Sequence, residues 1–259
     1  MQALKGESRL KREFEVCGYQ IFRGYSEVFL PVRNRLVSLL KMKFRDLPLI
    51  EDEAAFGAFM GNVYETDKKS VLDLYSVFDR TPEMMLASFH PRIVVALREL
   101  GLKSPIVSSY PTWRLDLYNN PQRRWFPWHQ DSYHENFSEN SVTVWIPLLN
   151  SGPETKGKGL VIKEGSHRIG IAQTGANKFE ITDPRINDFK EVEHSLSFGD
   201  FVVLNSLVVH RSGVITEKPG MRLTLQFRYD DLEEPNYIAK GWPRNFSIVD
   251  AINHNRFGI

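Results

Sequence analysis

The sequence predicts one domain in which a helical part is followed by an antiparallel β-sandwich or barrel. Before about residue 105, apolar residues recur at helical spacing. After it come short segments rich in β-branched and aromatic residues, separated by Gly, Pro, Asn and Ser. We therefore expect a single domain over residues 1–259, in which 1–105 form mostly helical support, 106–232 the β core and 233–259 a C-terminal extension.

Three helices are predicted in the first part. Residues 26–44 carry apolar side chains at helical spacing, as Leu36 and Leu40 illustrate. Pro82 follows Thr81 and is typical of a first helical turn, because proline has no N–H to leave unsatisfied there. Residues 90–101 form the third candidate, with Gly101 as its expected C-cap.

Five strand segments are predicted in the second part. They cover residues 113–118, 141–148, 159–167, 194–210 and 221–229. Their composition and the turn residues between them favour short strands. The polar segment 172–193 is expected to form a surface excursion between strands.

Several of these strands alternate between apolar and polar side chains. In the segment 221–229 one face carries Leu223, Leu225 and Phe227, and the other carries Arg222, Thr224, Gln226 and Arg228. One interpretation is a sheet whose polar face meets water. The other is a sandwich or barrel whose apolar outer face packs on the helices while its polar inner face lines a cavity.

Composition limits the classes of function. The net charge is +1, from 33 basic and 32 acidic residues, so neither nucleic acid nor a membrane surface is an expected partner. No apolar run approaches the roughly 18 residues of a membrane span. A lone cysteine, Cys17, cannot form an internal disulfide, and the N-terminal residues lack a signal-peptide pattern. We expect a soluble cytoplasmic protein that acts on a small molecule.

The segment PWHQDSYHE, residues 127–135, has a pattern typical of metal ligands. In an extended chain His129 and Asp131 point to the same side, and would supply two of the three ligands of a facial iron site. His210 is the candidate third ligand, and His134 is a candidate for a substrate contact. Structural or solvated roles better explain the remaining histidines, which are His90, His167, His194 and His254.

The order of these motifs resembles the phytanoyl-CoA dioxygenase family of Fe(II)- and 2-oxoglutarate-dependent oxygenases. The resemblance rests on His129-x-Asp131, His210 and Arg222, set among VWIPL, GSH, FGDFVVL and HRSG, and runs from GYQIFRGY at residues 18–25 to about residue 230. It implies a double-stranded β-helix, a jelly-roll or cupin-like core, with N-terminal helices packed on one sheet. It also implies Fe(II), 2-oxoglutarate and O2 as cofactor and cosubstrates.

The resemblance implies a role for each matching residue. His129, Asp131 and His210 would bind iron, and Arg222, helped by Thr224, would grip the distal carboxylate of 2-oxoglutarate with a planar guanidinium. Further positions that match cosubstrate contacts in the family are Gln130, Trp145 and Ser212. Related halogenating enzymes lack the carboxylate ligand, so Asp131 favours hydroxylation of a small metabolite with release of succinate and CO2. Desaturation, epoxidation and ring formation on the same three ligands stay open as alternatives.

Two alternatives stay open for the metal site, and two for the substrate. The same ligands could serve a zinc or nickel isomerase of the cupin type, or a silent 2-oxoglutarate sensor. For the substrate, the aromatic-rich loop before the metal ligands and the inward strand faces predict a cationic mouth for a carboxylate or phosphate, formed by Arg114, Arg123, Arg124 and Arg228. Alternatively the loop arginines are solvated, and Arg114 pairs with Asp116 or another acid.

Overall fold

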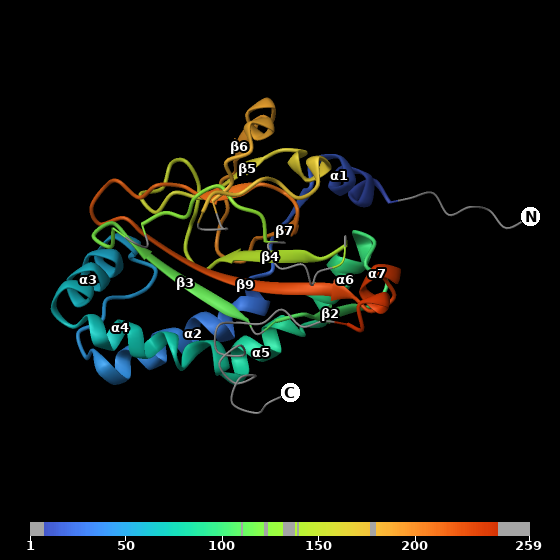
Figure 1. Cartoon of the computed structure of the whole chain (residues 1–259). Coiled ribbons are helices and arrows are strands. Elements are labelled where there is room, and N and C mark those ends of the chain that lie inside the picture. The colour runs from blue at the N-terminus through green and yellow to red at the C-terminus, as the bar shows by residue number, and fades with distance from the viewer. Residues whose placement is uncertain are drawn as a thin grey trace, which may run out of the picture.

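The computed structural model describes residues 8–109, 111–121, 124–131, 138, 140–176 and 180–242. Two antiparallel sheets pack against each other, and α-helices cover the outer side of the larger sheet (Figure 1). This is the double-stranded β-helix with supporting N-terminal helices that we expected. Arg123, His134 and His254, which the sequence brought into consideration, lie outside the described residues.

The helices gather in the N-terminal part and the strands mostly follow. The α-helices are α1 (Arg9–Cys17), α2 (Ser26–Lys43), α3 (Glu53–Thr66), α4 (Lys68–Tyr75), α5 (Pro82–Ser88), α6 (Pro91–Glu99) and α7 (Pro235–Ala239). The strands are β1 (Tyr19–Phe22), β2 (Pro105–Val107), β3 (Thr112–Leu117), β4 (Val142–Pro147), β5 (Leu160–Lys163), β6 (Glu191–Glu193), β7 (Phe201–Asn205), β8 (His210–Ser212) and β9 (Met221–Asp231). Short 3-10 turns occupy Phe78–Arg80, Ser166–Ile169 and Pro184–Asp188.

Strand β9 pairs with three other strands of the large sheet, β2, β3 and β4. The sheet runs in the order β1-β7-β4-β9-β2, with β3 also paired to β9, whereas the small sheet has the order β6-β5-β8. In the antiparallel register Asp116 lies opposite Arg222 on one side of β9, and Thr143 lies opposite Arg228 on the other. Residues directly opposite each other share a face, so these side chains all lie on the inner face.

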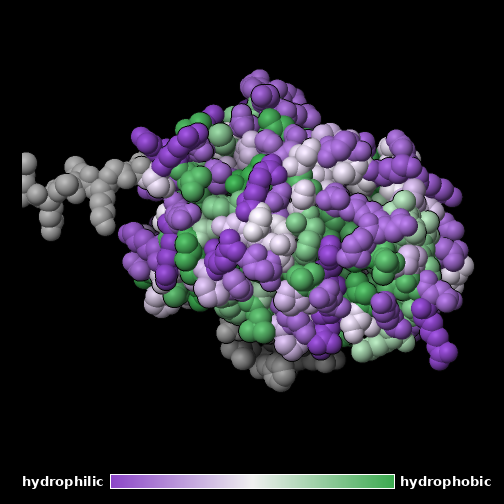
Figure 2. Space-filling view, turned by 180° about the vertical axis from the view of Figure 1, so that it is seen from behind, coloured by the Kyte–Doolittle hydropathy of each residue, from purple (hydrophilic) through white to green (hydrophobic). Residues whose placement is uncertain are grey.

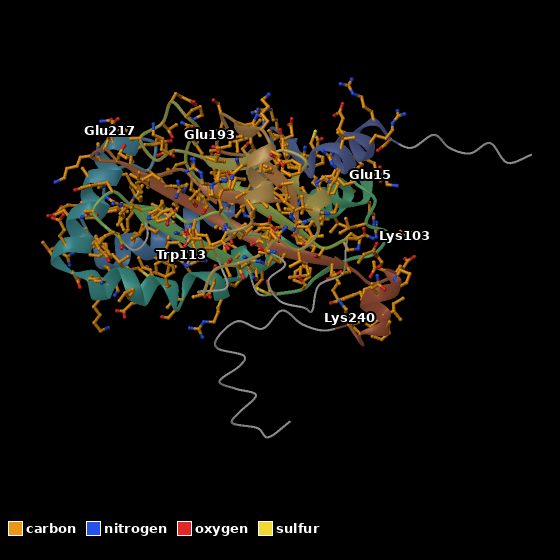
Figure 3. All side chains as sticks on the ribbon, turned by 45° about the horizontal axis from the view of Figure 1, so that its top comes forward. Glu15, Lys103, Trp113, Glu193, Glu217 and Lys240 are labelled. Carbon is orange, nitrogen blue, oxygen red and sulfur yellow. The ribbon has the colours of Figure 1, made fainter. Side chains whose placement is uncertain are left out.

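The outer face of the large sheet is apolar and covered. Leu223, Leu225 and Phe227 are at most 2% exposed and pack in one core with the helices. Each such side chain stabilises the fold by roughly 1.5–3 kcal/mol through its removal from water. Figure 3 labels Trp113 on β3, whose ring stacks on Tyr75 at 4.3 Å between centroids. The sandwich interpretation is therefore correct, and the water-exposed sheet is not.

The predicted helices are present at their expected positions. The segment 26–44 becomes α2, and Pro82 opens α5. The third helix ends at Glu99, after which Gly101 adopts a φ of +113°, a conformation that favours glycine. Within the described residues, no helix combines the length and the apolar character needed to cross a membrane. One face of the molecule carries small apolar patches scattered among hydrophilic residues (Figure 2).

Two strand predictions need correction. The segment 194–210 is not one strand, because a turn after Asn205 separates β7 in the large sheet from β8 in the small one. The Asn205 side chain accepts a hydrogen bond from the backbone N–H of Leu207 at 2.9 Å, a local bond that favours a turn. His210 therefore begins β8 instead of ending an apolar strand. The segment 172–193 is also more than an excursion, since its end forms β6.

Candidate metal and cosubstrate site

Backbone pairing brings His129 and His210 together across 81 positions of the chain. The N–H of His129 donates to the carbonyl of His210 at 2.9 Å, and the reverse bond measures 3.0 Å. This reciprocal pair extends the small sheet beyond β8. The two imidazole rings lie 4.1 Å apart between centroids, so both side chains enter the same space between the sheets.

Backbone carbonyls hold both imidazoles in one tautomer. The Nδ1 of His129 lies 2.8 Å from the carbonyl oxygen of Pro127, and the Nδ1 of His210 lies 3.0 Å from that of Val208. A carbonyl oxygen only accepts, so each Nδ1 carries the proton and each Nε2 carries the lone pair that a metal ion needs. Such outer hydrogen bonds orient the histidine ligands of metal sites.

Asp131 completes a compact group of potential ligands. One ligand atom from each of His129, Asp131 and His210 lies within 4.8 Å of the others, and all three side chains are buried. Two imidazole nitrogens and a carboxylate oxygen are the donor set of mononuclear iron(II) oxygenases, which leaves coordination positions open. The residues present therefore fit a divalent first-row metal ion.

The protonation states also suit metal binding. Burial, aided by the neighbouring His210, lowers the pKa of His129 to about 3, so the ring is neutral at pH 7. Burial alone would raise the pKa of Asp131, but the Arg228 guanidinium and the two imidazoles hold it well below its ordinary range. A neutral imidazole and an ionised carboxylate are the forms that bind metals.

Gln130, a position that matches cosubstrate contacts in the family, holds the segment that carries the first two ligands. Its Nε2 donates to the carbonyls of Gly170 at 2.8 Å and Leu207 at 2.6 Å, while its Oε1 accepts from the N–H of Ala172 at 2.9 Å. Both amide hydrogens are therefore used away from the cavity. Gln130 acts as a structural clamp beside the ligands.

A cavity of about 370 Å³ lies next to the three candidate ligands. It is lined by Trp113, Arg114, Phe126, His129, Asp131, Trp145, Leu160, His210, Ser212, Thr224, Gln226 and Arg228. The structure thus brings together the predicted residues Trp145, Ser212, Thr224, Arg114 and Arg228 with the candidate ligands. The cavity size lies near the lower end of the range of roughly 300–1,000 Å³ usual for small-molecule pockets.

Arg222 is not among the residues that line this cavity, and its guanidinium already donates four hydrogen bonds. Its Nε and Nη2 donate to Oδ2 of Asp116 at 3.0 and 2.5 Å, and its Nη1 donates to the carbonyls of Gly157 and Gly213. Arg114, by contrast, does line the cavity. Arg114 donates to the other oxygen of Asp116 at 2.5 Å, as one of our alternatives anticipated. Two guanidiniums thus share one fully buried carboxylate.

The expected cationic mouth is only partly formed by the described residues. Arg124 is exposed and does not line the cavity, and Trp125 beside it is 39% exposed. Arg114 and Arg228 do line the cavity, one next to Asp116 and the other next to Asp131. The guanidinium of Arg114 also lies 4.8 Å from the centre of the Phe126 ring, within the range of a cation–π contact.

The sequence analysis assigned no role in the site to three residues. They are Asp116, which it named only as a possible partner of Arg114 and which also binds Arg222; Gln226, which lines the cavity; and Thr143, whose hydroxyl bonds to Asp131. Alternation along the strands placed all three on inward faces. That signal could have identified all three as candidates, although not the pairing of Asp116 with Arg222 or of Thr143 with Asp131.

Comparisons with known proteins concern the fold and the family of this chain. Three similar solved structures are the epimerase SnoN in complex with Fe3+, alpha ketoglutarate and nogalamycin RO (17% identity, 86% of this chain, 82% of that chain, TM-score 0.59); the non-heme alpha ketoglutarate dependent carbocyclase SnoK (16%, 95%, 96%, 0.58); and EctD from S. alaskensis with 2-oxoglutarate and 5-hydroxyectoine (14%, 90%, 80%, 0.58). At these identities the likeness concerns the fold.

The family itself follows from the sequence. A search of curated proteins gives no match. The pattern of one family, described as Phytanoyl-CoA dioxygenase (PhyH), matches residues 45–219, which is more than half of the 259 residues. That stretch contains all three candidate ligands. The chain belongs to the phytanoyl-CoA dioxygenase family.

Proposed function

We propose that this protein is a cytoplasmic Fe(II)- and 2-oxoglutarate-dependent dioxygenase that hydroxylates a polar small-molecule metabolite, with release of succinate and CO2. The observation that carries the proposal is the buried group of two histidines and one aspartate beside a cavity. His129, Asp131 and His210 would hold the iron. With 2-oxoglutarate and O2, the iron would supply an oxidant able to remove a hydrogen atom from the substrate.

The cosubstrate end of the cavity is proposed to lie toward Arg222. Thr224 and Ser212 offer hydroxyl groups there, and Trp145 supplies an apolar wall. Arg114 and Arg222 together carry one positive charge more than Asp116 neutralises, which would attract the distal carboxylate of 2-oxoglutarate. Arg114 faces the cavity, whereas Arg222 would bind the carboxylate only after giving up part of its contact with Asp116.

The chemistry of the protein's own residues supports this assignment. Burial keeps His129 neutral, so Nε2 would donate electrons to the metal at pH 7. Asp131 supplies the negative charge that a chloride-binding relative would lack, which favours hydroxylation over halogenation. Similar structures include an epimerase and a carbocyclase, so the products must be identified as well as the turnover.

A succinate-release assay tests the proposal. Protein supplied with Fe(II), 2-oxoglutarate and air is screened against small metabolites, and we expect stoichiometric succinate and hydroxylated product. Asp131→Ala should abolish succinate release, and it should weaken Zn(II) binding measured by calorimetry by about 100-fold, since it removes the charged ligand. Asp188→Ala, at an exposed position, is the matched control.

The alternatives predict different results. A metal-dependent isomerase would convert substrate without consuming 2-oxoglutarate. A silent sensor would bind 2-oxoglutarate and release no succinate. Either result, obtained with iron bound, would replace the proposed function.

A further inference from the structure

The end of the cavity next to Asp131 holds a pair of polar side chains that the metal chemistry does not use. Arg228 and Gln226 project from the same face of β9 and both line the cavity. Nη2 of Arg228 donates to Oε1 of Gln226 at 3.1 Å and contacts Oδ1 of Asp131 at 3.4 Å. The second contact is longer than an ordinary charge-assisted hydrogen bond, which measures about 2.7–2.9 Å.

The contact between these two residues fixes the direction of the glutamine amide. An arginine only donates hydrogen bonds, so the oxygen of Gln226 must face Arg228, and its NH2 group must point the other way. Among the described residues, neither Nε2 of Gln226 nor Nε and Nη1 of Arg228 has a hydrogen-bond partner, although the Arg228 side chain is only 14% exposed. This end of the cavity therefore offers a cluster of N–H donors.

Donors without an acceptor select for a negatively charged group. A carboxylate offers two charged acceptor oxygens and no donor, whereas a neutral amide offers one uncharged acceptor oxygen beside its own N–H groups. The cosubstrate is proposed to lie near Arg222 and Arg114, at the other end of β9. Thr224 and Gln226 lie between Arg222 and Arg228 on the same face of this strand, so the cosubstrate does not need Arg228. Phe126 lines the same cavity and would cover an apolar body.

We propose that Arg228 and Gln226 bind a carboxylate of the organic substrate, so that the enzyme acts on small organic acids. This inference rests on the proposed function, because it names the substrate class of the same site. The cavity of about 370 Å³ must hold both the cosubstrate and the substrate, which restricts the substrate to a compact molecule. Arg228 thus determines specificity, and the three candidate ligands do not.

A binding experiment tests the substrate class without turnover. Protein saturated with redox-inert Zn(II) and 2-oxoglutarate is titrated with compact fragments in matched pairs, each carboxylate beside its primary amide, and dissociation constants are measured by ligand-observed NMR. A charge-assisted hydrogen bond predicts that carboxylates bind about tenfold or more tightly than their amides in wild type. Arg228→Met should remove this preference, whereas Arg124→Met, at an exposed position, should keep it.

A second variant separates substrate binding from metal binding. Because Arg228 also contacts Asp131, Arg228→Met could act through the metal, so Zn(II) saturation is verified by calorimetry. Gln226→Leu leaves the contact with Asp131 intact and should reduce the preference severalfold. Equal binding of carboxylates and amides to wild type, or no binding by either, would overturn the inference, and so would an unchanged preference in Arg228→Met.

The two proposals fail in different ways. If wild-type protein releases no succinate with any substrate, the proposed function is lost, while the carboxylate preference stands or falls by its own titration. If succinate is released but carboxylate and amide fragments bind equally well, the enzyme class holds and Arg228 does not bind a carboxylate of the substrate.

Discussion

Arg222 and Arg228 lie on the same inner face of β9, and each contacts an aspartate. Arg222 donates two hydrogen bonds to Oδ2 of Asp116 and two more to backbone carbonyls. Arg228 reaches Oδ1 of Asp131 only at 3.4 Å. Asp116 has no other cavity role in the described structure, while Asp131 belongs to the candidate metal site. We call the part of β9 next to Asp116 the closed end, because the donors of Arg222 are bonded there. We call the part next to Asp131 the open end, because Arg228 has donors without a partner among the described residues.

The two pairs differ in how far their geometry depends on a bound ligand. In the Asp116 pair almost every donor of the guanidinium is satisfied, so its geometry is held before any ligand arrives. In the Asp131 pair, a metal ion would draw the carboxylate to itself and leave Arg228 available to a substrate anion. One end of β9 is thus preorganised, and the other depends on what is bound.

The largest expected effect is on stability at the closed end. Arg222→Met leaves Asp116 with a single partner in a fully buried position, and should lower the free energy of unfolding by about 3–5 kcal/mol. Arg228→Met removes a long contact and should cost about 1 kcal/mol or less. Urea unfolding of the metal-free proteins measures both, with Arg124→Met as control. Equal losses would contradict the distinction between the two ends.

A smaller effect should link the closed end to the cosubstrate. Asp116→Asn leaves two guanidiniums without their shared charge, so we expect a loss of about 3 kcal/mol. A bound 2-oxoglutarate would replace that charge, so it should raise the melting temperature of the variant more than that of wild type. Asp200→Asn, which breaks the pair with Arg23 elsewhere, is the control and should show no such gain. No gain in Asp116→Asn would remove the cosubstrate from this end.

Much of this arrangement could be predicted from local patterns. Alternation along the strands placed Thr224 and Arg228 on an inward face, and the His-x-Asp spacing located the candidate ligands. The same alternation would have pointed Gln130 away from its neighbours His129 and Asp131, which is where the structure has it. The prediction of a cosubstrate contact for Gln130 rested on the family match and not on the geometry of an extended chain.

The remaining features depend on distant pairing. Asp116 meets Arg222 because β3 and β9, which are separated by more than 100 residues, pair in one particular register. A single sequence does not specify that register, since any shift by two residues keeps the same faces inward. The separation of β7 from β8 has a similar origin, because the apolar residues 207–209 continue the strand pattern through the turn.

The open end should also respond to pH, since it contains the histidines. The pKa of His129 is about 3 in the folded protein and about 6.5 when unfolded, so the unfolded chain binds more protons between these values. Stability of the metal-free protein is therefore complete above about pH 6.5 and falls below it, by up to about 1.4 kcal/mol per pH unit for this group.

Unfolding by urea between pH 7 and pH 4.5 measures this slope. His129→Gln should reduce it, and the slope that remains should come from His167 and His194, whose pKa values burial also lowers. The depressed pKa of Asp131 contributes only near and below about pH 4, when its carboxyl becomes protonated in the unfolded chain. An unchanged slope in His129→Gln would show that the imidazole is not kept neutral by the fold.

The smallest expected effects come from two threonines, one at each end. Thr143 lies opposite Arg228 and its hydroxyl bonds to Asp131, while Thr224 lies opposite Arg114 and lines the cavity. Each Thr→Val change removes about one hydrogen bond, worth about 1 kcal/mol or a factor of about five.

Thr143→Val should weaken Zn(II) binding by that factor, because Asp131 loses the hydrogen bond from the threonine hydroxyl. Thr224→Val should instead raise the 2-oxoglutarate concentration needed for half-maximal succinate release. Calorimetry and the succinate assay, applied to both variants, form a crossed test. If each variant changed both constants equally, the row on β9 would act as one site, and its two ends would not be separable.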